Sequence, residues 1–170
     1  MLRDGVLTGY FHASQHIRVV EVLMQSAARI IESLQIYAVK HLQILLDLFA
    51  PVLTDAFALA YAPAVLSAAK ALHATILNCW PRFVGTPHAE RIINLVARCW
   101  TNIHDTAEKD TKGEFKDIGS ELTQTISLLA VLWKDSGEPV PTEKLDQVVG
   151  KAPHLKSLFK PLQQGASAAR

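Results

Sequence analysis

The sequence predicts an all-α protein of about five or six helices, and three observations support this. Apolar residues recur every three or four positions along most of the chain, as on the buried stripe of a helix. Prolines and capping residues stand where these segments begin or end. Hydrophobic residues make up 49% of the 170 residues and charged residues 19%, below the roughly 25% of typical soluble domains. This composition argues against disorder.

The first two predicted helices cover residues 14–34 and 36–49. Ser14 is expected to cap the first, because its hydroxyl can accept a hydrogen bond from a free amide of the first turn. Pro51 is expected to limit the second, because proline lacks an amide hydrogen and clashes with the preceding turn. Residues 52–62 hold either one short helical turn or only a connector.

The third predicted helix begins near Pro63 and stops at Pro81. It carries six alanines between Ala62 and Ala74. Small side chains let neighbouring helices approach closely, so we expect this helix to be buried at the centre of the fold.

The fourth helix starts with Thr86 as a cap and Pro87 as its first residue. A fifth follows over residues 120–134, and a short sixth begins at Thr142. The sequence therefore divides into four parts, which are a helical region (1–104), a charged loop (105–119), C-terminal helices (120–160) and a flexible tail (161–170). Helical periodicity alone leaves two arrangements open, a closed bundle or an open array of antiparallel pairs.

The sequence shows no catalytic constellation. It has no glycine-rich phosphate loop and no nucleophile elbow. His12 and His16 lie four residues apart without a third ligand at a useful spacing, so we expect no metal site and no cofactor. No carboxylate pair lies in an apolar segment, and we expect no enzyme. The alternative is a small all-α ligand-binding or haem-binding domain, for which His41 and His73 are candidate ligands.

Net charge, the length of the uncharged stretches and the cysteine content limit the partners and the cell compartment expected for the protein. A net charge of +1 creates no field that would attract nucleic acid or an anionic membrane. The longest stretch without charge covers residues 56–69, shorter than the about 20 residues of a membrane span. No signal-like segment precedes the helices, and the two cysteines, Cys79 and Cys99, fit buried thiols in a reducing compartment. We expect a protein of the cytoplasm and nucleus.

The most unusual segment covers residues 76–83 and reads ILNCWPRF. Pro81 ends the helix, Trp80 can anchor the last turn against the next helix, and Arg82 can bond the free carbonyls at the helix end. This reading makes the segment a structural corner. The other reading makes it an interface anchor, because Trp and Arg are enriched among binding hot spots.

Residues 13–100 resemble the C-terminal region of the second TELO-interacting protein family. The specific parts are Val39-Lys40-His41-Leu42, Pro51 to Leu53 with Asp55 and Pro63 after it, and above all Asn78-Cys79-Trp80-Pro81-Arg82. The aspartate is followed here by Ala56-Phe57, a small departure from the family. No motif after Asp105 can be matched.

The resemblance implies a C-terminal fragment of a HEAT-like or armadillo-like α-solenoid. It also implies a scaffold function in the TTT complex, a co-chaperone assembly for phosphatidylinositol-3-kinase-related kinases. The partners would be the other TTT subunits and, indirectly, chaperones of the ninety-kilodalton heat-shock class and the kinases. The motif positions carried over are Asn78, Trp80, Pro81 and Arg82, either as a partner-binding site or as a structural corner.

Overall fold

The computed structural model describes residues 2–83, 85–107, 110, 113–137 and 142–167, with the side chains of 2–4, 142–144 and 164–167 left out. No strand occurs in these ranges, which confirms the all-α prediction. The α-helices are α1 (Thr8–Ala13), α2 (Ile17–Leu34), α3 (Leu42–Thr54), α4 (Ala62–Cys79), α5 (Pro87–Thr106), α6 (Glu114–Ser136), α7 (Thr142–Lys151) and α8 (Lys156–Ser167). Shorter helical turns join them, namely η1 (Leu2–Leu7), η2 (Gln35–His41), η3 (Ala56–Tyr61), η4 (Trp80–Arg82) and η6 (Pro153–Leu155).

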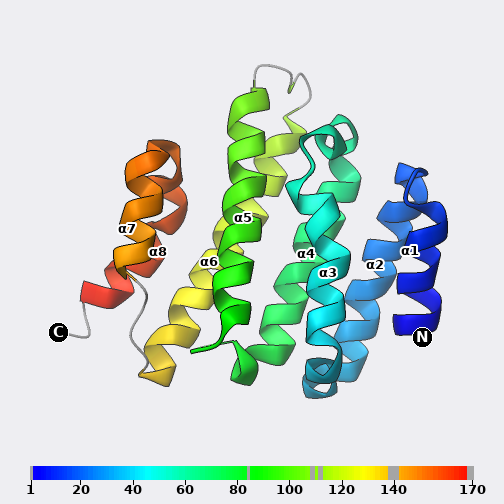
Figure 1. Cartoon of the computed structure of the whole chain (residues 1–170), viewed down its shortest axis with the longest axis horizontal. Helices are drawn as coiled ribbons and strands as arrows, with labels where there is room; N and C mark the ends of the chain where they lie inside the picture. The colour runs from blue at the N-terminus through cyan, green and yellow to red at the C-terminus, as the bar shows by residue number, and fades with distance from the viewer. Residues whose placement is uncertain (1, 84, 108–109, 111–112, 138–141, 168–170) are drawn as a thin grey trace.

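The helices form consecutive pairs that stack side by side in two layers (Figure 1). In one layer α2 packs against α4, α4 against α6 and α6 against α8. In the other layer α3 packs against α5, while α1 and α7 lie at either side (Figure 1). The first and last pairs stand at opposite ends of the molecule (Figure 1). Of the two arrangements left open by the sequence, this one is an open array of helix pairs.

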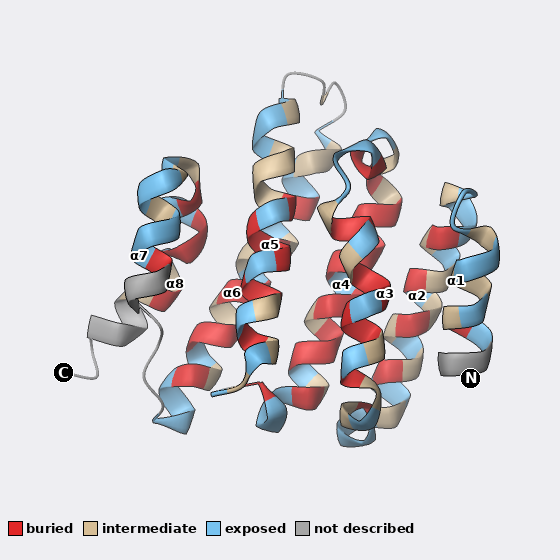
Figure 2. Cartoon of the chain, in the orientation of Figure 1, coloured by how far each residue is buried: buried red, intermediate tan, exposed pale blue. Residues whose placement is uncertain are grey.

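Helix α4 lies at the centre of the array, as its alanines predict. It contacts α2, α3 and α6. Most of its residues are buried, and only a few along its length are exposed (Figure 2). The alanines at 62, 64, 68, 69, 71 and 74 are all buried. An alanine side chain ends at Cβ, so a neighbouring helix can approach the α4 backbone closely on more than one side.

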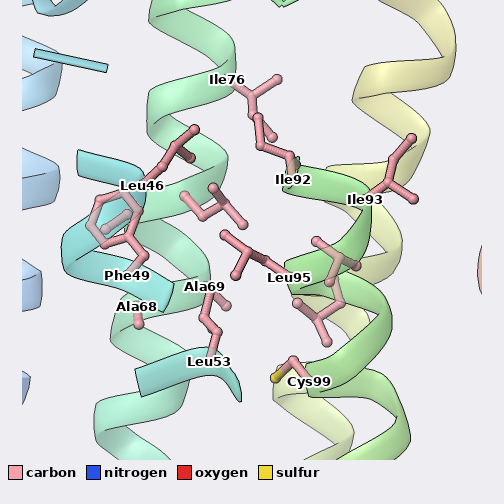
Figure 3. Packing of buried hydrophobic residues seen from close by; sticks show 14 of the residues in the cluster. Leu46, Phe49, Leu53, Ala68, Ala69, Ile76, Ile92, Ile93, Leu95 and Cys99 are labelled. Carbon is pink, nitrogen blue, oxygen red and sulfur yellow. The ribbon is translucent and has the colours of Figure 1, made fainter. Parts of the chain in front are cut away.

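Larger side chains of the second layer complete this core. Leu46, Phe49 and Leu53 of α3 and Ile92 and Cys99 of α5 meet Ala68, Ala69 and Ile76 of α4 (Figure 3). All of these side chains are buried, with exposed fractions of 1% or less. Small residues on the central helix and large ones around it fill the interior without steric conflict.

Two predicted helix ends differ from the structure. Ser14 does not cap α2, because it is the C-cap residue of α1, a short helix that the sequence analysis missed. His16 occupies the N-cap position of α2 without a side-chain hydrogen bond. Pro51 lies inside α3 instead of ending it. The interior proline costs about 3 kcal/mol, and burial of Val52 and Leu53 immediately after it offsets this cost.

The C-terminal half contains more helix than predicted. Helix α6 begins at Glu114, so residues 114–119 are helical and not part of a loop. The carboxylate of Asp110 explains this early start, because its two oxygens accept hydrogen bonds from the backbone amides of Glu114 and Phe115 at 3.0 Å each. Gly113, which immediately precedes α6, adopts φ +73°, a left-handed conformation that favours glycine. The expected tail from residue 161 belongs to α8 as far as Ser167, and Leu162 is fully buried there.

Two helical stretches are long and apolar enough to cross a membrane by length and composition alone, where the sequence analysis expected none. They are Ile17–Thr54 and Ala56–Arg82. The first is not one straight helix, because the chain turns at Gln35, which has φ +48°. In each stretch, about half of the apolar 18-residue segment that meets this criterion is buried inside the protein (44% and 56%). Buried core helices of soluble proteins often have this length and apolar composition as well, so length and composition alone are weak evidence for a membrane span.

The central position of α4 predicts a large difference between two of its leucines. Leu72 is fully buried, whereas Leu77 is 57% exposed. Leu72→Ala should lower the free energy of unfolding by about 2–5 kcal/mol through a cavity beside the neighbouring helices. Leu77→Ala is the matched control and should change it by less than about 0.5 kcal/mol. Urea unfolding of both variants measures this, and equal losses would contradict the central role of α4.

Candidate interaction surfaces

The corner between α4 and α5 exposes the residues singled out by sequence and buries a different one. Trp80 is 50% exposed, and Pro81 and Arg82 are exposed beside it on the turn η4. Phe83, directly after them, is fully buried. Trp80 is therefore only half buried, and the choice between a structural corner and an interface anchor stays a prediction. The fully buried Phe83 attaches the corner to the core.

Hydrogen bonds at this corner also differ from the expected ones. The Thr86 hydroxyl lies 2.9 Å from the Arg82 carbonyl oxygen and 2.8 Å from that of Phe83. Thr86 occupies the predicted N-cap position of α5, but its side chain makes no cap bond there. Asn78 donates through its Nδ2 to the carbonyl of Ala74 at 2.8 Å. Within the described residues no ion pair ties Arg82 to the helix end, and this residue is exposed.

A second turn exposes apolar side chains at the same end of the molecule. The turns η2 and η4 both lie at the end where α3 and α5 begin (Figure 1). Ile36 and Tyr37 on η2 are 48% and 68% exposed. Together with Leu77, Asn78, Trp80, Pro81 and Arg82 they form what we call the end surface. Exposed apolar side chains gathered at one site are typical of protein contact surfaces.

The two candidate haem ligands, His41 and His73, lie outside the linings of the two hollows beside α5 that are described below. His73 is half-buried, and its Nδ1 lies 3.3 Å from both Thr125 Oγ1 and Glu121 Oε1 on α6. It therefore links α4 to α6, as expected for a histidine at the core boundary. His41 is half-buried at the end of η2.

Charged and histidine side chains mainly connect helices. Asp47 of α3 pairs with Arg91 of α5 at 2.6 Å. The ring of His104 stacks on that of His154 at a centroid distance of 4.6 Å, joining α5 to η6. Within the described residues no group of three or more metal-binding side chains occurs.

Two hollows open on the surface beside α5. The first holds about 400 Å³ and lies between α5, the end of α3 and the α7–η6 segment; its polar lining is Thr54, Asn94, Arg98, Thr101 and Asn102. We call it the α5 groove. The second holds about 500 Å³ between the C-terminal part of α5 and the N-terminal part of α6. Trp100, Ile103 and Phe115 make its lining mainly apolar. Sequence reasoning found neither, because each is assembled from segments far apart in the chain.

These features define the class of the protein, an all-helical array whose described residues offer contact surfaces. Its N-terminal part is similar to a known family. The sequence model of the Tti2 family matches residues 1–60, which confirms the resemblance to the second TELO-interacting proteins for that part of the chain. The motif Asn78-Cys79-Trp80-Pro81-Arg82 lies beyond the matched residues. No curated protein and no solved structure matches the chain.

The corner geometry predicts that neighbouring aromatic residues differ in their contribution to stability. Phe83→Ala should lower the free energy of unfolding by about 3–5 kcal/mol, because it removes a fully buried ring. Trp80→Ala should cost clearly less, since half of the indole already contacts water. Thermal unfolding followed by circular dichroism compares the two. A larger loss for Trp80→Ala would show that its indole is the anchor after all.

Both cysteines are free and buried, as the sequence predicts. Burial raises the pKa of the Cys79 thiol to about 11 and that of the Cys99 thiol to about 12, from an ordinary 9.0. The folded protein therefore keeps these protons at a pH where the unfolded chain releases them. This contribution to stability is complete below pH 9 and is lost as the pH rises towards 11 and 12.

We therefore expect both thiols to resist an aromatic disulfide reagent at pH 8 in the folded protein, because the reactive thiolate is suppressed and inaccessible. In denaturant both should react fully. The free energy of unfolding should fall above pH 9, and less steeply in Cys99→Ala. Fast labelling of either thiol in the native protein would contradict the buried positions.

Proposed function

We propose that this chain is a scaffold subunit of the TTT complex, the co-chaperone assembly that supports maturation and stability of phosphatidylinositol-3-kinase-related kinases. The observation that carries the proposal is the match of residues 1–60 to the Tti2 family. It covers 60 of the 170 residues, so membership of the remainder rests on continuity with this part. The corner motif, quoted above for the resemblance, supports extending it to residue 82.

The arrangement of the helices supports a HEAT-like or armadillo-like α-solenoid as the finer fold assignment. Each helix pair contacts mainly the pairs before and after it, which is the packing principle of solenoid proteins. Such an array has a large surface for its length, and this suits a protein that holds others together. The low fraction of charged residues fits a surface that is partly covered in a complex.

We assign the contact with companion TTT subunits to the end surface, including Asn78, Trp80, Pro81 and Arg82. Trp80 combines a large apolar face with an indole N–H, and Arg82 adds a guanidinium without an ion-pair partner in the described structure. Residues of these two types contribute most to binding energy when a partner removes them from water. The complex would act in the cytoplasm and nucleus, with chaperones and kinases reached through the assembly.

Co-expression with the other TTT subunits tests this function. The tagged chain should recover them in a pull-down followed by size-exclusion chromatography. Trp80→Ala combined with Arg82→Ala should reduce recovery about tenfold or more, because both side chains become buried at the interface. Phe57→Ala is the matched control, since Phe57 is 88% exposed on η3, which precedes α4 and so lies at the other end of that helix from η4.

Unchanged melting temperatures must accompany the loss of binding for the end surface to be responsible. If the wild-type chain elutes alone in the presence of every companion subunit, the proposed function is wrong. If the double variant binds as well as the wild type, the function stands and the assignment to the end surface fails.

A further inference from the structure

The α5 groove has the shape of a site for a short stretch of extended chain. Asn94, Arg98 and Asn102 lie four residues apart, so their side chains follow one another along a single face of α5. At about 1.5 Å per residue this line is about 12 Å long. An extended peptide advances about 3.3 Å per residue, so about four of its residues would match the line.

The volume of the groove agrees with this size. It holds about 400 Å³, within the range of about 300–1,000 Å³ found for sites that bind small ligands. A partner helix, with a diameter of about 10–12 Å including side chains, would need a broader trough. The groove therefore suits an extended segment better than a docked helix.

The groove has one charge, and it is positive. Arg98 is exposed and is the only ionised side chain among the described residues that line it. The ion pair of α5, between Arg91 and Asp47, lies two turns away, and Arg98 takes part in none of the salt bridges found in the described structure. A guanidinium in this state favours a carboxylate, which it can bind through two parallel hydrogen bonds.

The two asparagines flank this charge with groups that match a peptide backbone. A carboxamide carries both donors and an acceptor, as a peptide group does. Asn102 donates through its Nδ2 to the carbonyl of Thr54 at 3.1 Å, which fixes its orientation and leaves its oxygen as an acceptor. Asn94 is exposed at the other end of the line.

The opposite wall of the groove is apolar and comes from another part of the chain. Val148 of α7 is 37% exposed, and Leu155 of η6 lies beside it, largely buried. Two hydrogen bonds hold this wall against α5: one joins Thr101 Oγ1 and His154 Nε2 at 3.0 Å, and in the other Trp100 Nε1 donates to the His154 carbonyl at 3.2 Å. The site is therefore positive and polar on one side and aliphatic on the other.

From this geometry we propose that the α5 groove binds an extended, acidic segment of a partner protein, with an Asp or Glu side chain on Arg98 and an adjacent aliphatic side chain on Val148. Asn94 and Asn102 bond the backbone on either side of the carboxylate. The proposal rests on the groove alone and is independent of membership in the TTT complex.

A random-peptide library displayed on phage and panned against the whole chain tests the ligand class. The selected sequences should share an acidic residue next to an aliphatic one. The best peptide, labelled with fluorescein, is then titrated by anisotropy. Arg98→Gln should weaken binding about tenfold or more, and Arg29→Gln, an exposed arginine of α2, is the matched control and should leave it unchanged.

A pair of variants on the opposite wall separates charge from folding. Both Val148→Glu and Val148→Lys should weaken binding because they remove the aliphatic contact, and Val148→Glu should weaken it far more because it adds a like charge near the peptide carboxylate. Enrichment of basic or uncharged peptides, equal binding by Arg98→Gln, or equal effects of both Val148 variants would overturn the proposal. Full displacement by inorganic phosphate at millimolar concentration would also overturn it, because the site would then recognise a simple anion.

Discussion

The burial of α4 between its neighbours is the constraint on which the rest of the structure depends. Its small side chains allow α2 and α6 to approach from either side within one layer, while α3 approaches from the other layer. A larger side chain at Ala68 or Ala69 would force these helices apart, because a close-packed interior has little free space. The positions of the first two helix pairs, and of α6 after them, follow from this one packed helix.

The two contact surfaces follow from how the pairs are joined. At the end of α4 the chain needs one inward anchor, and Phe83 provides it. The preceding turn is then free to direct Trp80 and Arg82 outward. The α5 groove has a different origin, because α7 meets α5 mainly through η6 and its stacked histidine. This leaves a space between the two helices that Arg98 and Val148 line from opposite sides.

These two surfaces suit a protein that acts by holding others. The end surface is apolar and aromatic, which favours a stable contact with a folded subunit. The α5 groove is narrow and positive, which favours a short, extended and acidic segment. A scaffold with both kinds of surface can keep one partner bound while it captures a flexible part of another. The match of the first 60 residues to the Tti2 family is consistent with the co-chaperone role proposed for this arrangement.

Much of the fold could be predicted from the sequence, because helical periodicity and small-residue content are local properties. Residues 17–34 and the alanines of α4 could be assigned without coordinates, as could the start of α5 at Pro87. Prediction failed where distant residues decide the outcome. The interior position of Pro51 depends on the burial of Val52 and Leu53.

The candidate site shows the same division. The sequence by itself determined that Trp80 and Arg82 stand at a helix corner, since Pro81 stops the helix locally. Only the tertiary structure decided how far each side chain is buried, because burial depends on the helices packed around the corner: Phe83 is fully buried, whereas Trp80 is 50% exposed. The α5 groove was beyond sequence reasoning altogether, since Arg98 and Val148 lie 50 positions apart in the chain and line one groove only because η6 packs against α5.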